Sequence, residues 1–396
     1  MGFRPVVQFR IALLASTIAL AVYSNCAEAQ AYDFRIVHRF GGLGDGSDPD
    51  GPVQFDAAGN LYGVTKSDNG AIFRIAKDGT ESILYSFRDN RTAGGPADIA
   101  VDPATGDVYG AAAFGGDMSA CSGYGCGLIY KVTAGGTYTV LHRFDDLEGQ
   151  RPGGLIRDDE GNLYGTTWEG GTYGLGTIFK YGMDGSFTVL HAFEGSPNSR
   201  WSNSDVIRDR AGNLYGTTEG GGTAGYGSVF KLAPDGAFTT LYDFTGGMDG
   251  KSPAYGVVRD ESGNLYGAAL GGGTHGWGTV FKLTADGTLT TLYNFMDKAD
   301  GGTPKSVVLV NGNLYGTTFE GGYPDCNLGT CPVIFRIAAD GAYTVLRSFT
   351  WRDGCIAPGA GLTLKYGRLF GTTARNGESF GSCDADTVYS VGITQP

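Results

Sequence analysis

Aromatic and acidic side chains recur together in glycine-rich segments of this 396-residue sequence. An aromatic ring offers an apolar face for stacking, and a carboxylate accepts hydrogen bonds from hydroxyl groups, so the combination suits recognition of a sugar. The candidate ligand-binding residues are Trp168, Glu169, Tyr173, Glu219, Tyr226, His275, Trp277, Glu320 and Tyr323. In the alternative interpretation, these aromatic side chains only cap neighbouring β-strands and bind no ligand.

Signals for catalysis are few. Residues 377–381 match the Gly-x-Ser-x-Gly pattern, but no helix is predicted to follow, as a nucleophile elbow requires. His38, His142 and His191 share one repeated position and are interpreted as packing residues, while His275 has no partner at metal-ligand spacing. We therefore assign no catalytic residue, and enzymatic activity stays an open question.

Six cysteines follow residue 29, and in an exported chain an even number predicts disulfides. The predicted pairs are Cys121–Cys126, Cys326–Cys331 and Cys355–Cys383. A thiolate metal site is the alternative, but its ligands would have to come from distant parts of the chain.

Acidic residues also lie in Asp-Gly-x-x-Pro elements and nearby segments: Asp45, Asp48, Asp50, Asp249, Asp300 and Asp353. Such oxygens can bind Ca²⁺, although Asp-Gly elements are more typical of plain turns. We expect no cofactor, and keep Ca²⁺ as the alternative.

The first 29 residues have the features of a secretory signal peptide. Arg4 and Arg10 flank the start of an apolar run over residues 11–22, and the small residues Ala27 and Ala29 predict cleavage after Ala29. Cys26 suggests a lipoprotein instead, but residues 23–25 fit that motif poorly. We expect a secreted or periplasmic protein with residues 30–396 as one domain and no membrane anchor in the mature chain.

The formal net charge is −12. Nucleic acids and anionic membranes select for basic surfaces, so neither is an expected partner. We expect a monomer whose partner is an extracellular glycan or protein.

A pentad ending in glycine recurs seven times, with its last residue at positions 63, 110, 165, 216, 267, 316 and 371. In the third copy, apolar runs and turn residues predict strands over 154–158, 162–167, 177–180 and 186–193, the last after an Asp-Gly hairpin turn. Four hairpin-connected strands per copy, with no helical period, predict a seven-bladed β-propeller of four-stranded antiparallel blades. The repeated glycine is expected to let a neighbouring backbone approach.

The two ends of the chain complement each other. The seventh copy ends after its third strand at residues 388–391, and residues 34–40 resemble an isolated fourth strand. The N-terminal strand is therefore predicted to complete the last blade and close the ring.

The repeat resembles that of the bacterial GloVer tandem-repeat proteins, whose consensus runs like residues 241–253 followed by Gly263-Asn264-Leu265-Tyr266-Gly267 and residues 278–283. The resemblance covers essentially all of the chain after the signal peptide. It implies an exported repeat protein, in a family described by its repeat and by varied C-terminal sorting anchors, not by an activity.

The leading functional hypothesis is a non-enzymatic binding or interaction propeller whose ligand, a glycan or peptide, meets the face that contains the aromatic loops. The alternative is a secreted polysaccharide hydrolase or lyase that uses carboxylates near the propeller axis, and a third hypothesis is a structural surface protein. An axial pocket with convergent acidic residues from non-equivalent positions favours the enzyme, and a shallow aromatic face favours binding.

Overall fold

The computed structural model describes residues 32–41, 47–66, 70–87, 94–195, 199–200, 202, 205–296, 300–321, 332–350, 353, 357–359, 361–374 and 385–393. The predicted signal peptide lies outside these ranges. The only helix among them is one 3-10 turn, η2 (Cys121–Gly123). The described part contains no helix with the length and apolar character needed to cross a membrane.

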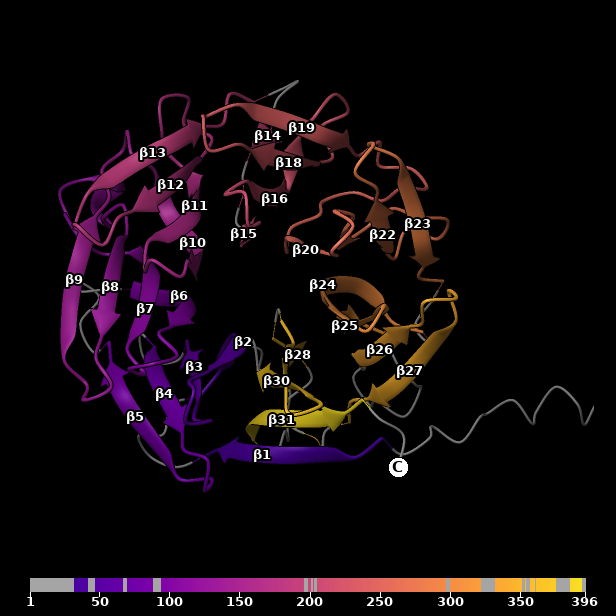
Figure 1. The fold of residues 1–396 in the computed structure, drawn as a ribbon, viewed down its shortest axis with the longest axis horizontal. Helices are drawn as coiled ribbons and strands as arrows, with labels where there is room; N and C mark the ends of the chain where they lie inside the picture. Colours follow the sequence, from indigo (N-terminus) through magenta and orange to yellow (C-terminus); the bar gives the residue numbers. More distant parts are fainter. Residues whose placement is uncertain are drawn as a thin grey trace, which may run out of the picture.

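Seven antiparallel sheets stand around a central axis, and each is one blade (Figure 1). Blades 1 to 3 consist of β2 (Pro49–Phe55), β3 (Leu61–Thr65), β4 (Ala71–Ile75) and β5 (Glu81–Ser86); β6 (Gly94–Val101), β7 (Val108–Phe114), β8 (Leu128–Val132) and β9 (Tyr138–Arg143); and β10 (Gln150–Arg157), β11 (Leu163–Glu169), β12 (Thr177–Tyr181) and β13 (Phe187–Ala192).

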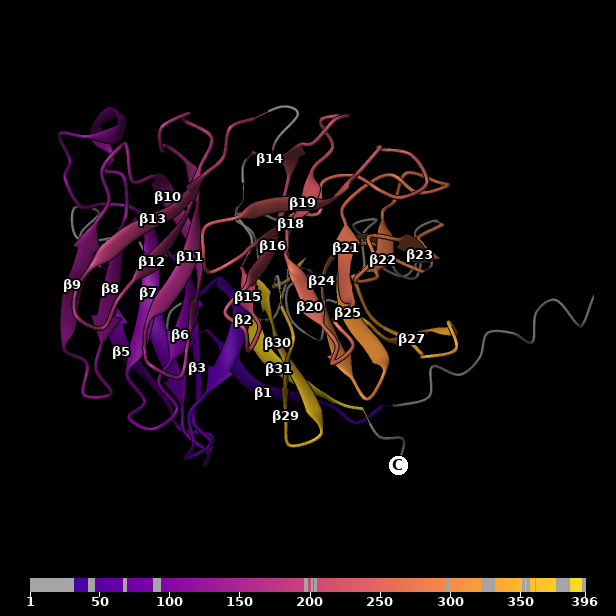
Figure 2. The ribbon, with the colours of Figure 1, turned by 45° about the horizontal axis from the view of Figure 1, so that its top comes forward.

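Blades 4 to 6 follow the same order. They consist of β15 (Ile207–Arg208), β16 (Leu214–Thr218), β18 (Ser228–Leu232) and β19 (Phe238–Asp243); β20 (Val257–Arg259), β21 (Leu265–Ala269), β22 (Thr279–Leu283) and β23 (Leu289–Asn294); and β24 (Gly302–Val310), β25 (Asn313–Glu320), β26 (Val333–Ile337) and β27 (Tyr343–Ser348). A small ribbon of β14 (Ser199–Arg200) and β17 (Gly220–Gly221) accompanies blade 4. The first strand of each blade is innermost and the fourth is outermost (Figures 1 and 2).

Blade 7 joins the two ends of the chain. It contains β28 (Ala357–Pro358), β29 (Thr363–Lys365), β30 (Arg368–Ala374), β31 (Asp386–Gly392) and β1 (Phe34–Phe40). Strand β1 pairs antiparallel with β31, with Phe34 opposite Val391 and Phe40 opposite Asp386. The predicted ring closure by the N-terminal strand is confirmed.

The hydrophobic core is divided among the blade interfaces. Seven clusters of buried residues occur in the described part, one between each pair of neighbouring blades. At the closing interface, Phe40 of blade 7 meets Phe73 of blade 1 edge to face, with ring centroids 5.1 Å apart. Burial of both sheet faces explains why the strands are rich in apolar residues rather than strictly alternating.

The repeated glycine makes room for a ring within its own blade. A Cβ on Gly165 would lie 2.7 Å from Cζ of Phe179, and Gly216 and Gly267 face Phe230 and Phe281 in the same way. The expected close backbone approach is also seen in blades 3, 5 and 6. A Cβ on Gly165, Gly267 or Gly316 would lie 2.8, 3.1 or 2.9 Å from the carbonyl oxygen of Gly154, Gly256 or Ser306, respectively.

A buried aspartate stabilises the turn between the first two strands. The Asp158 carboxylate accepts hydrogen bonds from the Asn162 amide N–H at 2.8 Å, from Asn162 Nδ2 at 3.0 Å and from the Tyr164 hydroxyl at 3.2 Å. Asp56, Asp209 and Asp260 repeat this arrangement in blades 1, 4 and 5. These aspartates therefore belong to the architecture of the blade.

Candidate functional site

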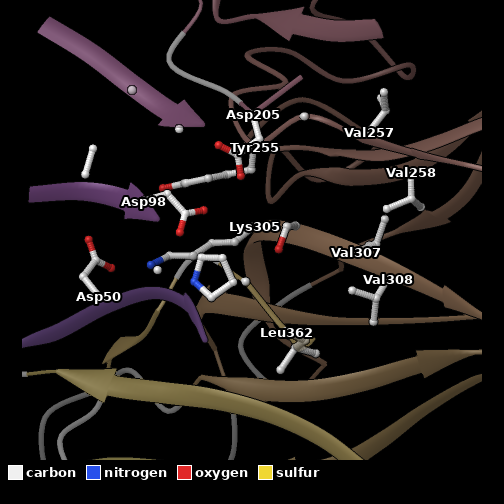
Figure 3. Close-up of a pocket in the computed structure, with 18 of the residues that line it drawn as sticks. Asp50, Asp98, Asp205, Tyr255, Val257, Val258, Lys305, Val307, Val308 and Leu362 are labelled. Carbon is white, nitrogen blue, oxygen red and sulfur yellow. The ribbon is translucent and has the colours of Figure 1, made fainter. Parts of the chain in front are cut away.

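A cavity of about 610 Å³ lies on the axis, where the innermost segments of all seven blades converge. Its wall includes a charged group of Asp50, Lys66, Asp98, Asp205 and Lys305, with Tyr255 beside it. Figure 3 shows Asp50, Asp98, Asp205, Tyr255 and Lys305 directed toward a common space. We call these five residues and Lys66 the axial cluster.

The axial cluster contains departures from the repeat. In blades 2, 3, 5 and 6 a buried aliphatic residue of the first strand pairs with the repeated glycine, for example Ile99 with Gly110 and Leu155 with Gly165. The sequence repeat places the buried residues Val53, Val206 and Leu362 at the same position in blades 1, 4 and 7. The residue before this aliphatic position faces the cavity, and in the seven blades it is Pro52, Asp98, Gly154, Asp205, Gly256, Ser306 and Gly361. Carboxylates thus occur at this position in blades 2 and 4 only, which points to a role beyond architecture.

Asp98 and Asp205 interact directly although a whole blade separates them. The Asp205 carboxyl group lies over Gly154 of blade 3, in the space that a Cβ there would occupy. It hydrogen-bonds with the carboxyl group of Asp98, which also accepts the Ile99 amide N–H at 2.7 Å. Burial raises the pKa of both residues, and the negative charge of Asp205 raises the pKa of Asp98 further. Two carboxyl groups in contact hold one proton between them to a higher pH than a lone aspartate does.

Asp50 forms a second charged centre in the cavity. It makes an ion pair with Lys66, and Lys305 is a further positive neighbour. Burial alone would raise the pKa of Asp50, but the two ammonium groups outweigh it and the net effect lowers that pKa. Burial lowers the pKa of Lys305, which is 8% exposed and lies 5.1 Å from the ring centroid of Phe319.

The remaining wall of the cavity is largely apolar. It includes Val257, Val258, Val307, Val308 and Leu362, which Figure 3 shows on the side away from Asp50 and Asp98. Burial and then the negative charges of Asp50 and Glu219 raise the pKa of Tyr255. The cavity therefore offers polar contacts at one end and an apolar surface at the other.

Of the loop residues predicted from the sequence, none that the structure describes lines this cavity. Arg151 stacks on Trp168, with its guanidinium carbon 5.3 Å from the ring centroid, and forms an ion pair with Glu169 at 3.6 Å. The same guanidinium lies 5.5 Å from the ring centroid of Phe114, whose neighbour Tyr124 is 67% exposed. Trp168, Glu169 and Arg151 thus form a local surface cluster between blades 2 and 3.

The other predicted residues are distributed around the ring. Trp277 packs against Gly302 and the cluster between blades 5 and 6, as the capping alternative supposed. Tyr173 and Tyr226 are exposed, and His275 hydrogen-bonds through Nδ1 with the hydroxyl of its neighbour Thr274. Glu219 and Glu320 are partly buried, and Tyr323 lies outside the described residues. Their role in glycan binding stays a prediction.

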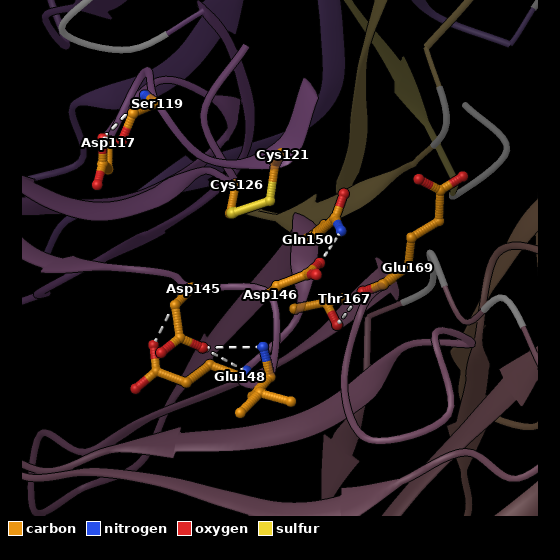
Figure 4. The surroundings of a disulfide bond; sticks show 11 residues. Asp117, Ser119, Cys121, Cys126, Asp145, Asp146, Glu148, Gln150, Thr167 and Glu169 are labelled. Carbon is orange, nitrogen blue, oxygen red and sulfur yellow. Dashed lines mark hydrogen bonds between the residues drawn. A yellow bond between two sulfur atoms is a disulfide. The ribbon is translucent and has the colours of Figure 1, made fainter. Parts of the chain in front are cut away.

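One predicted disulfide is present. Cys121 and Cys126 are bonded in the long loop of blade 2, with Cα atoms 5.2 Å apart (Figure 4). The carbonyl of Cys126 accepts the amide N–H of Arg151 from blade 3, so the disulfide loop is also joined to the next blade. Cys326, Cys331, Cys355 and Cys383 lie outside the described residues.

The Asp-Gly element at residues 249–250 forms a turn. Asp249 accepts hydrogen bonds from the Thr245 amide N–H at 2.7 Å, the Thr245 hydroxyl at 2.6 Å and the Tyr242 hydroxyl at 3.1 Å. Within the described ranges, no three or more histidine, cysteine or acidic side chains gather as a metal site would need. The oxygens of Asp249 are thus engaged by the protein itself.

Of the axial cluster, only Asp50 was among the candidates predicted from the sequence, and the five missed residues are Lys66, Asp98, Asp205, Tyr255 and Lys305. A detectable signal was present, because aligning the seven copies on the aliphatic position shows carboxylates in only two of them. The direct contact between those two carboxyl groups depends on the radial arrangement of the blades.

Several solved structures resemble this chain in fold. Virginiamycin B lyase from Staphylococcus aureus matches with a TM-score of 0.58 and 12% identity, over 91% of this chain and 100% of the lyase. A catalytically inactive variant of that lyase with quinupristin matches with a TM-score of 0.56 at the same identity and coverage. An extracellular domain from B. thetaiotaomicron matches with a TM-score of 0.56 and 10% identity, over 90% of this chain and 39% of that one. These identities support the fold alone.

No curated protein matches the sequence. The sequence pattern of the Gloeobacter/Verrucomicrobia repeat matches residues 106–332, which is more than half of the chain. This match agrees with the resemblance found in the repeat itself, and the chain belongs to the Gloeobacter/Verrucomicrobia repeat family.

Proposed function

We propose that this chain is an exported propeller that binds a small organic ligand in its axial cavity. The observation that carries the proposal is the axial cluster. Its charged residues depart from the repeated sequence at the place where the seven blades converge. A concave site with a few convergent polar groups and an apolar wall is the usual form of a small-molecule site. The Cys121–Cys126 disulfide supports export, since disulfides persist in oxidising compartments.

The axial cavity is favoured over the aromatic loop face as the main site. Trp168 is stacked on Arg151, and Trp277 is packed into a blade interface, so both rings are already in contact with the protein. The exposed rings of Tyr124, Tyr173 and Tyr226 are the remaining candidates for stacking on a glycan.

The test compares two sets of variants in a thermal-shift screen. Monosaccharides, uronic acids, amino acids and amines are tested against wild type, Lys305→Met, Asp205→Asn, Trp168→Ala and Trp277→Ala. The proposal expects at least one compound to raise the Tm of wild type, with the shift lost in at least one of the two cavity variants and kept in the two tryptophan variants. A shift that disappears only in the tryptophan variants places the ligand on the loop face and contradicts the proposal.

A second candidate function is hydrolysis or elimination by acid–base catalysis in the same cavity. The specific observation in its favour is the hydrogen-bonded pair of Asp98 and Asp205, in which one carboxyl group is a proton donor and the other an acceptor. Carboxyl groups in contact are closer than the roughly 5 to 9.5 Å separations used by glycosidases, so this pair does not match that mechanism. The alternative of polysaccharide hydrolysis would therefore need Asp50 as one of its two carboxylates.

Turnover assays on aryl glycosides, aryl esters and uronate-containing polysaccharides test this second function. Acid–base catalysis by the pair predicts that Asp98→Asn and Asp205→Asn each lower the rate by about 10²- to 10⁴-fold. Turnover that is unchanged in both variants excludes the pair as the catalyst.

A further inference from the structure

The charges in the axial cavity do not balance by themselves. Three carboxyl groups, those of Asp50, Asp98 and Asp205, face two ammonium groups, those of Lys66 and Lys305. An unbalanced charge is costly here, because burial withdraws the carboxyl groups of Asp98 and Asp205 from bulk water. One proton held between Asp98 and Asp205 would bring the cluster to neutrality.

The two lysines are associated with Asp50. Lys66 forms the ion pair with Asp50, and the charges of Lys66 and Lys305 both lower its pKa. The Asp98–Asp205 pair instead experiences the negative charge of Asp50, in addition to the repulsion within the pair. The negative charge that Lys66 and Lys305 do not balance is thus located at the Asp98–Asp205 pair.

The pair lies at the polar end of a cavity whose other side is aliphatic. Val257, Val258, Val307 and Val308 supply a surface for an apolar body, while the carboxyl oxygens of Asp98 and Asp205 accept hydrogen bonds. An ammonium group has several N–H donors and one positive charge, so it satisfies both carboxylates and restores neutrality. A metal ion fits less well, because the described residues provide no group of three ligating side chains.

We infer that the ligand of the axial cavity is an organic ammonium ion with an apolar body, and that it takes the place of the proton held between Asp98 and Asp205. This inference rests on the proposed function and adds the chemical class of the ligand. It requires that binding releases a proton wherever the pair is protonated. Other charged or titratable groups at the site are Asp50, Lys66, Lys305, Tyr255 and the nearby Glu219.

Three probes of similar size and different charge test the inference: 2-phenylethylammonium, 2-phenylethanol and 3-phenylpropionate. Isothermal titration calorimetry is run near pH 5 and near pH 7, each in two buffers of different ionisation enthalpy, so that proton release is measured with affinity. We expect the ammonium probe to bind at least about tenfold more tightly than the alcohol, equal to about 1.4 kcal/mol, and to release up to one proton. Its affinity should increase with pH.

The variants assign the effect to the pair. In Asp98→Asn/Asp205→Asn the preference for the ammonium probe and the proton release should both disappear. Asp340→Asn removes the same charge from an exposed hairpin turn and should bind like wild type. An ammonium preference that survives in the double variant would overturn the inference, as would a lack of proton release at both pH values.

The remaining outcomes separate this inference from the proposed function. If the alcohol or the carboxylate binds best and Lys305→Met abolishes binding, the cavity is a ligand site but the ligand is not a cation. Stabilisation by Ca²⁺ alone that is lost in the double variant would assign the pair to a metal ion and also overturn the inference. No binding of the ammonium probe up to its solubility limit contradicts it as well, while the thermal-shift screen still decides the proposed function.

Discussion

The carboxyl group of Asp205 lies over Gly154 of the neighbouring blade, in the space that any larger residue would need for its Cβ. Gly154 thus permits the contact between Asp205 and Asp98 from blade 2. Since Gly154 has no left-handed backbone conformation, an alanine there is acceptable to the backbone and acts mainly by displacing the Asp205 carboxyl group.

Gly154→Ala is therefore expected to separate the pair. Without its neighbour, Asp98 loses one of the influences that raise its pKa, so this pKa should fall toward the ordinary value. NMR titration of carboxyl carbons in aspartate-labelled protein measures the change. Gly135→Ala is the control, because Gly135 lies in a hairpin turn with space for a methyl group. An unaltered titration of Asp98 would show that Gly154 does not determine the contact.

The pair should make stability decrease as pH rises. Its pKa values are raised in the folded state, so above about pH 4 the native protein holds more protons than the unfolded chain does. The free energy of unfolding then falls by about 1.4 kcal/mol for each unit by which the native pKa exceeds the unfolded one. Urea denaturation at a series of pH values above about 4 should show a smaller decrease in the free energy of unfolding for Asp98→Asn than for wild type. Parallel curves for the two proteins would contradict the shared proton.

The blade aspartates should have the opposite dependence on pH. Hydrogen bonds from Asn162 and Tyr164 lower the pKa of Asp158 despite its burial, so its stabilising effect is present above the unfolded pKa. That stabilisation is lost as pH falls through the native pKa. At neutral pH, Asp158→Ala should reduce the free energy of unfolding by about 2 kcal/mol, because buried donors lose their acceptor. Asp159→Ala, at an exposed neighbouring position, should change it by less than about 0.5 kcal/mol in the same urea assay.

Ring closure depends on a well-packed phenylalanine. Phe40 is 1% exposed and contacts Phe73 across the interface of blades 7 and 1. Phe40→Ala should reduce the free energy of unfolding by about 3–5 kcal/mol, as for other large-to-small changes in a core. Leu147→Ala, at a side chain that is 71% exposed, serves as the comparison in calorimetry or urea denaturation. Similar losses for the two variants would argue against a closed ring.

The disulfide in blade 2 should contribute modestly to stability. It closes a short loop, since its cysteines are five residues apart, and chain entropy predicts about 2 kcal/mol for a loop of this size. Cys121→Ser/Cys126→Ser should lower the free energy of unfolding by that amount under non-reducing conditions. Ellman titration of the unfolded wild type with and without reductant checks that the bond is formed. Reduction should release two more thiols in wild type than in Cys121→Ser/Cys126→Ser.

Much of the fold was accessible from the sequence because the repeat is local. In the third blade, the predicted strands over 162–167, 177–180 and 186–193 correspond to β11, β12 and β13 within two residues at each end. The first strand was predicted to begin at residue 154 but begins at Gln150, which pairs with Glu169. Residues 150–153 gave no strand signal, although Gly153, like Gly154, lines the axial cavity.

The site was less accessible for a physical reason. Trp168 and Trp277 were prominent in the sequence as large aromatic residues in loops, yet the structure packs them against Arg151 and against Gly302. Asp98 and Asp205 were inconspicuous, because an aspartate near the start of a strand is typical of an ordinary turn. Nothing in either segment alone indicates that the two carboxyl groups meet.

The amino-acid sequence by itself determined the number of blades, their strand order and the closure by residues 34–40, because these follow from a repeated pattern and from pairing between neighbouring segments. The tertiary structure alone decided the composition of the axial cavity. Seven first strands converge at the axis, so residues from non-adjacent blades come within hydrogen-bonding distance there. Whether Asp98 reaches Asp205 depends on the curvature of the ring and on the absence of a side chain at Gly154 between them.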